Sequence, residues 1–341
     1  MFGLVIIILF VLLSIFAYFV SPDPSPNANR ITLEIGRLRP GQRQLFVKVR
    51  KEKNVATPGF VTRLISGAED KYSYIPIARY EITTDSIVVQ KFIDEGVSER
   101  QVFSKSQVDV QEPVVTKTFW LGTDTYGRDI LSRLIIGVRV SLGVGMITVI
   151  ISLTIGLLLG SLAGYFGGRT DDIIMWFMNV VWSIPTLLLV FAITLALGKG
   201  FWQVFVAVGL TMWVNVARLV RGQVLSVREL EYVEATRALG FSHARTIVHH
   251  ILPNILGPVM VIAASNFASA IVIEAGLSFL GIGVQPPQPS WGLMIKENYN
   301  FIMTQNPMLA IAPGLAIILF TLAFNLLGNG LRDALNVRGR I

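Results

Sequence analysis

The chain of 341 residues contains no cysteine. This excludes disulfide bonds, thiolate metal sites and thiol catalysis, although it does not identify a compartment. Charged residues are also scarce, at 15% of the sequence, whereas soluble domains usually carry about 25%. Since hydrophobic residues make up 52% of the chain and its mean hydropathy is positive, the composition predicts an integral membrane protein.

Two motifs are missing as well. No stretch fits the phosphate-binding pattern G-x-x-x-x-G-K-[ST], and "LALGKGF" lacks the first glycine, so the chain has no P-loop of its own for ATP. No block of Lys and Arg with interleaved aromatics occurs, and we therefore expect no nucleic-acid partner. The net charge of +7 is ordinary for a bacterial membrane protein, which carries excess Arg and Lys on its cytoplasmic side.

Long apolar runs dominate what is present. A bilayer core of about 30 Å requires about 20 apolar residues in a helix, and six segments approach or exceed that length. They are Phe2–Val20, Val138–Tyr165, Ile173–Leu197, Phe201–Ala217, Ile255–Leu280 and Met308–Leu327. The sequence thus predicts an all-α polytopic membrane protein with six transmembrane helices and a small extracytoplasmic α+β insert. Its expected parts are an anchor (1–20), the insert (21–117) and a five-helix core (118–341).

The first apolar run resembles a secretory signal peptide only in position. It lacks a basic region before the run, the run is long, and "FAYFVSPDP" offers no small-x-small cleavage site. We therefore interpret Phe2–Val20 as a retained anchor. Because a cytoplasmic N-terminus should carry a basic flank, we also expect the natural chain to begin upstream of Met1 with Lys or Arg before Phe2.

The insert, 21–117, differs in kind from the rest. It opens with the linker "SPDPSPNANR" and then becomes polar. The alternating stretches "RQLFVKVRK" and "DSIVVQKF" predict strands, and "SERQVFSK" predicts a short helix or turn. No catalytic constellation stands out in the insert.

Arginine clusters indicate the topology. The segments 198–200 and 281–307 hold only Lys199 and Lys296 as basic residues. The clustered arginines are Arg218, Arg221, Arg228, Arg237 and Arg245 around the loop 223–254, and Arg332, Arg338 and Arg340 in the tail. The positive-inside rule therefore puts this loop and the C-terminus in the cytoplasm, and six crossings put the N-terminus inside and the insert outside.

Three arginines disagree with that topology. Arg128, Arg133 and Arg139 precede the second span on its outer side. Asp124 and Asp129 stand four residues before Arg128 and Arg133, so ion pairing is expected to mute those two charges.

Two features of the spans invite interpretation. Gly156, Gly160 and Gly164 recur every four residues, which lines one helix face and lets another backbone approach closely; the alternative is that glycine is merely tolerated in a membrane helix. Pro185 removes a backbone donor and should kink the third span. That kink serves either a gate or packing.

The loop 223–254 contains a charged cassette between two apolar segments. Ser226 and Glu229 fit a capping box, and Gly240 suits the end of a helix that finishes near Leu239. The semi-apolar stripe at i, i+3, i+4 and i+7 consists of Tyr232, Ala235, Thr236 and Leu239. Ser242 is expected to cap a second short helix, and Pro253 suits the start of the next span. Such a surface helix either binds lipid head groups or enters a groove of another protein.

The cassette resembles that of the inner-membrane permease subunits of ATP-binding-cassette importers, which share E-A-A, three residues, G, nine residues, I-x-L-P. The matching positions are Glu234, Ala235, Thr236, Gly240, Leu252 and Pro253. Thr236 replaces the second Ala, and His250 replaces the Ile. "FWLGTDTYGRDILSRLIIGVRVSL" and "EAGLSFLGIGVQPPQPSWG" resemble the second permease subunit of dipeptide, oligopeptide and nickel importers. The resemblance covers most of Phe119–Ile341 and the anchor, and nothing carries over to the insert, which is longer than expected for this branch.

The resemblance implies a transport subunit without catalytic residues. In the family, the cassette forms a coupling helix that sits in a cleft of a separate ATPase subunit, which binds ATP and Mg. The implied partners are a similar second permease, two such ATPase subunits, an external substrate-binding protein and the bilayer. Peptide is the expected cargo, with nickel chelates or another small solute as the alternative. The rival classes are an ion-gradient-driven secondary transporter, which needs buried ion ligands, and a membrane-embedded enzyme, which needs a polar constellation at depth.

The remaining candidate residues do not indicate a specific function. His243, His249 and His250 lack a carboxylate at chelating spacing, so we expect ordinary interface or lipid head-group contacts and no metal site. Glu274 is the one acid well inside an apolar stretch, and it either lines the translocation path or acts as a structural hydrogen-bond anchor. "GVQPPQPSWG" should form an ordered outer loop with Trp291 at the level of the membrane interface.

Overall fold

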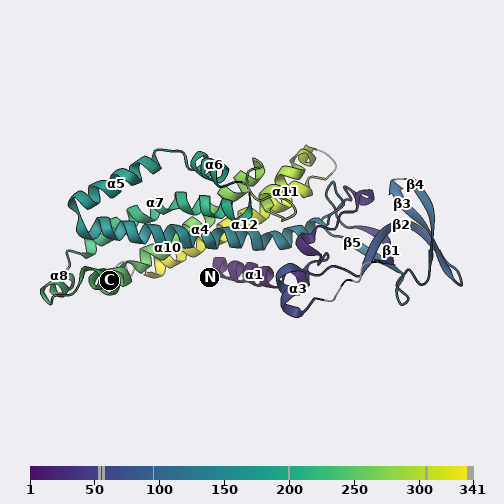
Figure 1. The fold of residues 1–341 in the computed structure, drawn as a ribbon, viewed down its shortest axis with the longest axis horizontal. Helices are drawn as coiled ribbons and strands as arrows, with labels where there is room; N and C mark the ends of the chain where they lie inside the picture. The colour runs from purple at the N-terminus through teal and green to yellow at the C-terminus, as the bar shows by residue number, and fades with distance from the viewer. Residues whose placement is uncertain (53–54, 56–57, 95, 199, 304–305, 336–341) are drawn as a thin grey trace. The chain divides into compact units, whose positions relative to one another are not determined.

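The structure is a computed structural model that describes residues 1–52, 55, 58–94, 96–198, 200–303 and 306–335. Its contacts separate two compact units (Figure 1). The first unit comprises Met1–Phe10, Ser141–Gln285 and Ile317–Ile341, and the second comprises Val11–Val140 and Pro286–Ala316. Three helices have residues in both units: α1 (Phe2–Ile15), α4 (Ile130–Phe166) and α12 (Met308–Leu335).

The remaining elements of the first unit are helical. They are α5 (Gly168–Trp182), α6 (Thr186–Leu197), α7 (Phe201–Val227), α8 (Glu231–Ala238), α9 (His243–Arg245), a π-helical stretch (Thr246–Ile251) and α10 (Leu252–Phe279). By length and apolarity, four helical runs in the described chain can cross a membrane: α4, α7, α12 and the run His243–Phe279. The pair α5 and α6 makes a fifth if it is counted as one bent span.

The first predicted span is shorter as a helix than its apolar run. α1 has 14 residues, which is about 21 Å at about 1.5 Å per residue, and so falls short of a bilayer core. The chain turns at Phe16 before α2 (Ala17–Val20) begins. α1 packs on α12 all the same, because the rings of Phe10 and Phe320 lie 4.6 Å apart between centroids.

The predicted kink at Pro185 is confirmed. α5 and α6 are bent by 90° at the break that contains this residue. Pro185 has an extended ψ of 125° and supplies no N–H to the helix before it, so the helical ladder ends at Ser183.

The glycine stripe of α4 is also confirmed as a contact face. A Cβ atom on Gly156 would lie 2.5 Å from Val216 Cβ, and one on Gly160 would lie 2.5 Å from the carbonyl oxygen of Ala217. Gly164 meets the carbonyl oxygen of Arg221 in the same way, at 2.8 Å. The stripe therefore brings the backbone of α4 directly against α7.

This contact predicts the effect of a large side chain at Gly160. We expect Gly160→Leu to destabilise the chain by about 1–3 kcal/mol or more, because the new side chain forces α4 and α7 apart. Gly143→Leu is the matched control on the same helix, since a Cβ there meets nothing within 4 Å. The thermal unfolding midpoint of the detergent-solubilised chain measures both, and equal midpoints for the two variants would contradict the packing role.

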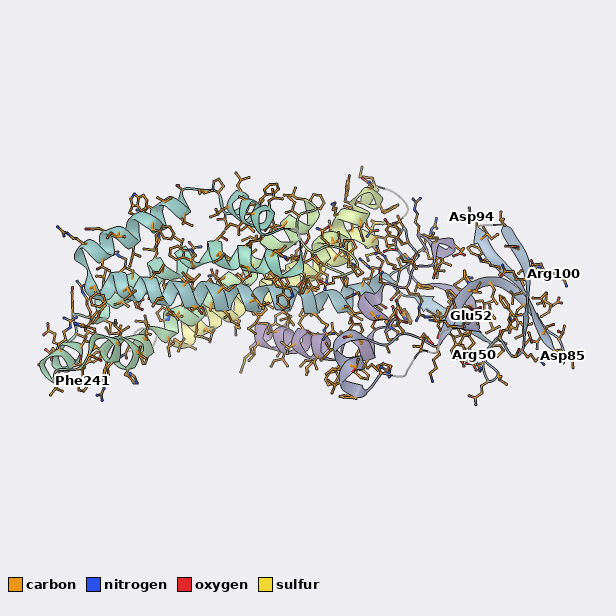
Figure 2. All side chains as sticks on the ribbon, viewed as in Figure 1. Arg50, Glu52, Asp85, Asp94, Arg100 and Phe241 are labelled. Atoms are coloured by element: carbon orange, nitrogen blue, oxygen red, sulfur yellow. The ribbon has the colours of Figure 1, made fainter. Side chains whose placement is uncertain are left out.

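The second unit contains an antiparallel sheet of five strands in the order β4-β3-β2-β1-β5 (Figure 1). The strands are β1 (Gln42–Arg50), β2 (Tyr72–Ile82), β3 (Ser86–Asp94), β4 (Val97–Ser104) and β5 (Val114–Phe119). One helix, α3 (Phe60–Ser66), lies between β1 and β2 in sequence. Alternating side chains form two apolar clusters, one around Val47 and one around Phe46. Labelled charged residues such as Arg50 and Arg100 project from the strands (Figure 2).

Two of the three predictions for this region hold. "RQLFVKVRK" lies in β1 and "DSIVVQKF" lies in β3, apart from a residue at one end of each. The prediction of a short helix or turn for "SERQVFSK" is wrong, because these residues belong to β4, which pairs with β3 from Asp94↔Val97 to Ser86↔Ser104. Pairing with a neighbouring strand outweighed the weak local preference.

Trp291 packs inside the second unit. It opens α11 (Trp291–Asn298), but its side chain is buried, and its indole Nε1 donates to the carbonyl oxygen of Leu134 at 3.1 Å. Gly137 provides the room, since a Cβ there would lie 2.9 Å from the indole ring. The tryptophan therefore packs on α4 within the protein.

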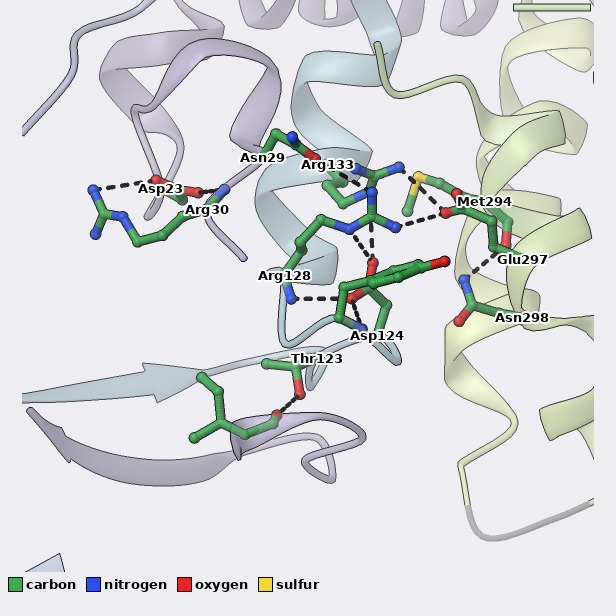
Figure 3. Close-up of polar contacts among 12 residues, drawn as sticks. Asp23, Asn29, Arg30, Thr123, Asp124, Arg128, Arg133, Met294, Glu297 and Asn298 are labelled. Atoms are coloured by element: carbon green, nitrogen blue, oxygen red, sulfur yellow. Dashed lines mark hydrogen bonds and ion pairs between the residues drawn. The ribbon is translucent and has the colours of Figure 1, made fainter. Parts of the chain in front are cut away.

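Arg128 and Arg133, which precede or begin the second span, both contact carboxylates, but only Arg128 has the partner that the spacing predicts. Arg128 Nε donates to Asp124 Oδ2 at 2.6 Å, as the spacing predicts. Arg133 does not pair with Asp129; its Nη2 lies 3.4 Å from Glu297, which also accepts from Arg128 Nη2 at 2.8 Å (Figure 3). Asp129 does not pair with Arg133 because it serves as the N-cap of α4: its carboxylate accepts the backbone N–H of Ser132 at 2.8 Å.

Candidate functional site

The cassette between α7 and α10 is the candidate site. Its helix α8 begins at Glu231, later than the capping box predicts. Ser226 instead lies in the last turn of α7, and Leu230 stands at the N-cap of α8 with no side-chain cap bond. The predicted capping box is therefore wrong, because α7 keeps its buried apolar face as far as Val224 and runs on through Ser226.

The end of the helix is as predicted. Gly240 has φ +76°, the left-handed conformation that glycine adopts without strain. Its N–H donates to the carbonyl of Arg237 at 2.9 Å, and the N–H of Phe241 donates to the carbonyl of Thr236 at 3.0 Å. These two bonds form a Schellman motif, which fixes where α8 stops.

One face of α8 is anchored to the membrane helices. Val233 is fully buried in an apolar cluster with Val220 and Val224 of α7, with Ile251 just before α10 and with Ile255 of α10. The hydroxyl of Thr236 lies 3.2 Å from that of Thr246 and donates to the carbonyl of Val233 at 2.7 Å. α8 is therefore held by contacts with α7 and with the helical run that leads into α10.

The opposite face of α8 is exposed. Tyr232 and Leu239 are 40% and 73% exposed, and Glu234 and Ala235 are exposed with them. Of the predicted stripe, only Thr236 turns inward. The exposed face thus presents two carboxylates, an aromatic ring and apolar side chains without covering from the described residues.

Hydrogen bonds stiffen the joints of the cassette. Asn254 Nδ2 donates to the Tyr232 hydroxyl at 2.9 Å and to the carbonyl of His250 at 2.7 Å. Arg228 Nη1 donates to the carbonyl of Gly164 at 2.9 Å, which ties the end of α4 to the same loop. The cassette is therefore braced against α4 and α10 by side chains that the motif does not include.

The C-terminal half of the cassette contains three further residues singled out in the sequence. Ser242 caps α9, since its Oγ accepts the N–H of Arg245. Leu252 packs against the apolar cluster, and Pro253 lies in the first turn of α10 with its side chain exposed.

The histidines make ordinary contacts. His243 Nδ1 is hydrogen bonded to the Tyr165 hydroxyl at 3.0 Å. The ring of His250 lies 5.6 Å from that of Phe241, which follows the end of α8 (Figure 2). Among the described residues, no group of three or more His, Cys, Asp or Glu side chains is placed to hold a metal ion.

Pro185 and Glu274 lie apart from the cassette. A cavity of about 240 Å³ opens beside the Pro185 break. Its polar lining comes from the bent pair, α7 and α10, and consists of Thr186, Thr211, Asn215 and Ser269. Glu274 is fully buried and accepts the Ser278 hydroxyl at 2.6 Å, and Ser278 Oγ in turn accepts the N–H of Val284 at 3.0 Å.

Comparison with known proteins agrees with this architecture. Residues 156–340 match the family described as the inner membrane component of binding-protein-dependent transport systems, and the chain belongs to this family. A solved structure of the MetNI methionine ABC transporter in an inward-facing conformation is 17% identical, with a TM-score of 0.50 over 60% of this chain and 97% of that chain. This likeness concerns the fold.

Three curated relatives illustrate the branch. The oligopeptide transport system permease protein OppC of Bacillus subtilis is 40% identical over 66% of this chain and 73% of its own length. The glutathione transport system permease protein GsiD of Pectobacterium atrosepticum is 43% identical over 64% and 72%. The nickel transport system permease protein NikC of Escherichia coli K12 is 41% identical over 64% and 78%. These names confirm the resemblance to the peptide and nickel permease branch.

Proposed function

We propose that this chain is the permease subunit of an ATP-driven importer that moves peptides across the bacterial inner membrane by alternating access. The observation that carries the proposal is α8, a short helix with an exposed face that is anchored by Val233 and Thr236 to both neighbouring spans. Such a helix transmits a push from a soluble partner to the membrane helices. Because the sequence has no P-loop, the partner that binds ATP and Mg is a separate subunit.

The proposed cycle assigns a role to each partner. Two ATPase subunits receive α8 of this chain and the equivalent helix of a similar second permease. ATP binding closes the ATPases, the two helices move, and the cavity between the permeases turns outward. An external binding protein then delivers cargo, and hydrolysis restores the inward-facing state. Within this scheme Glu234, Ala235 and Gly240 contact the ATPase, whereas Thr236 and Leu252 support the helix from behind.

The proposed orientation follows the arginines. Arg228, Arg237 and Arg245 mark the cassette as cytoplasmic, and the tail lies on the same side. α1 with α2 and the bent pair each count as one crossing, which gives six crossings in all. The N-terminus is then cytoplasmic, and the sheet of 42–119 is extracytoplasmic.

The bent pair gives a candidate for the translocation path. The cavity beside Pro185 combines hydroxyl and amide groups with apolar walls inside an apolar region, where polar groups usually face a pathway. Ile273 lines this cavity, whereas Glu274 bonds to Ser278. We therefore assign Glu274 to holding the loop after α10 and assign the Pro185 break to the path.

Cargo and energy source can be tested together. We expect the complex, reconstituted in liposomes with its ATPases and binding protein, to take up peptide only with ATP. The chain offers a docking helix, and its described residues include no group of three or more His, Cys, Asp or Glu side chains placed to hold an ion. A protonophore and a sodium ionophore should leave uptake unchanged. Uptake that stops with the ionophores although ATP is present would favour a secondary transporter, and stimulation of ATP hydrolysis by a nickel chelate but not by peptide would favour the nickel alternative.

A further inference from the structure

The second unit contains a cavity that the transport cycle does not use. Its volume is about 180 Å³, several times the roughly 30 Å³ that a water molecule occupies. It lies between the segment after α2, the strands β1, β2 and β5, and the residues just before α4. Its walls combine apolar side chains, such as Ile35 and Phe46, with four charged ones.

Two of the charged groups are cations that face the same ring. The Lys117 ammonium lies 3.5 Å from the centroid of the Tyr74 ring, and the Arg30 guanidinium lies 4.5 Å from it. Arg30 has acidic neighbours in Asp23 and Asp70, at 3.5 and 3.7 Å. Among the described residues, Lys117 has no carboxylate in ion-pair contact. Burial and, next, the charge of Arg30 lower the pKa of Lys117 to about 8, although the charges of Asp23, Asp70 and Asp129 act in the opposite direction. A carboxylate placed near both cations would relieve this repulsion.

The other two charged groups are the carboxylates of Asp23 and Asp129. Asp129 is 6% exposed, and its Oδ2 accepts both the N–H and the hydroxyl of Ser132. Its Oδ1 is buried and makes no hydrogen bond within the described part of the chain. Burial raises the pKa of Asp129, and the nearby charge of Asp23 adds to the effect. An ammonium group at Oδ1 would supply the missing donor.

We propose that this cavity binds a small zwitterion of the α-amino acid class with an apolar side chain. The carboxylate lies by Lys117 and Arg30, the ammonium lies at Asp129 Oδ1, and the side chain lies against Phe46 and the other apolar walls. Two cations and two anions line the cavity, so its formal charge is balanced. That balance disfavours a polyanion such as a nucleotide or a divalent cation, and it favours a ligand that carries one charge of each sign.

The site joins separate parts of the second unit. Lys117 belongs to β5, Arg30 follows α2, and Asp129 is the N-cap of α4. A bound zwitterion would therefore fasten the sheet to the first turn of a membrane-spanning helix. The proposal concerns binding alone and does not depend on which solute is transported.

Calorimetry on the full chain in lipid nanodiscs tests the proposal, with L-leucine as the probe. We expect saturable binding of leucine. Leucinamide lacks the carboxylate and 4-methylpentanoate lacks the ammonium, so each should bind at least about tenfold more weakly, as expected for loss of a charged hydrogen-bond partner. No saturable binding of leucine would overturn the proposal. Equal binding of 4-methylpentanoate would also overturn it, since that result describes a simple anion site.

Variants locate the site. Lys117→Met should weaken leucine binding at least about tenfold, while Lys105→Met, at an exposed lysine after β4, should leave it unchanged. Asp129→Asn keeps an oxygen that can cap α4 but removes the charge, so it should weaken binding without loss of fold. The unfolding midpoint of each variant separates lost binding from lost structure. Unchanged affinity in folded Lys117→Met would contradict the assignment.

Discussion

A complex that carries Gly240→Leu is expected to hydrolyse ATP at close to the normal rate while it takes up cargo about tenfold more slowly. Gly240 holds φ +76° at the end of α8, and leucine in that conformation is strained by about 1–2 kcal/mol. A strain of about 1.4 kcal/mol shifts the equilibrium between the native end of the helix and its alternatives tenfold toward the alternatives. Molecules in which this turn leaves its native conformation would lose the two Schellman hydrogen bonds to the carbonyls of Arg237 and Thr236.

The strain, and not crowding within the chain, is the expected cause. A Cβ on Gly240 meets nothing within 4 Å. Gly240→Asn is the matched variant, because asparagine tolerates the left-handed region better than leucine does. We expect this variant to retain most of the coupling.

Uptake and ATP hydrolysis are measured on the same proteoliposomes. The ratio of cargo taken up to ATP hydrolysed then tests the role of this turn in coupling. Normal uptake by Gly240→Leu would contradict the role of this turn in coupling. An equal loss in Gly240→Asn would show that the ATPase surface rejects any side chain at this position, so the contact with the partner would matter more than the backbone.

The sequence predicted the structure correctly at positions where the backbone chemistry of a single residue type, glycine or proline, determines the local conformation. Gly240 was predicted at the end of α8 because glycine tolerates positive φ, and Pro185 was predicted at a break because proline has no N–H to donate. The four-residue spacing of Gly156, Gly160 and Gly164 predicted a close helix contact, and the backbone of α7 fills that place.

Local signals failed where distant residues compete for the same group. Ser226 looked like a cap, but the apolar face of α7 carries the helix past it. Asp129 stands at ion-pair spacing from Arg133, yet it caps α4, and Glu297, more than 160 residues away in sequence, approaches the arginine instead. Val233 was not predicted as the anchor of α8, because its burial depends on residues from both flanking spans. Its spacing of three from Thr236 was the only signal.

Glu297→Met is expected to cause the largest loss of stability, about 3–5 kcal/mol, because it leaves buried arginines without their shared carboxylate. Arg128 and Arg133 are 3% and 0% exposed, and Asp124 is then the one carboxylate that remains in contact with them among the described residues (Figure 3). Its Oδ2 is 2.6 Å from Arg128 Nε but 4.0 Å from Arg133 Nε, so it cannot replace Glu297 for both. The cluster also ties the start of α4 to α11.

The free energy of unfolding in mixed micelles, followed by tryptophan fluorescence as a denaturing detergent is titrated, measures this effect. Glu34→Met is the matched control: Glu34 pairs with Lys91 at 3.1 Å, but both side chains are about a quarter exposed, so its loss should cost about 1 kcal/mol or less. Arg128→Met combined with Glu297→Met restores the charge balance, so the double variant should be more stable than the sum of the two single losses allows. If Glu297→Met is no worse than Glu34→Met, the buried arginines obtain their compensation elsewhere, and the cluster does not hold α4 to α11.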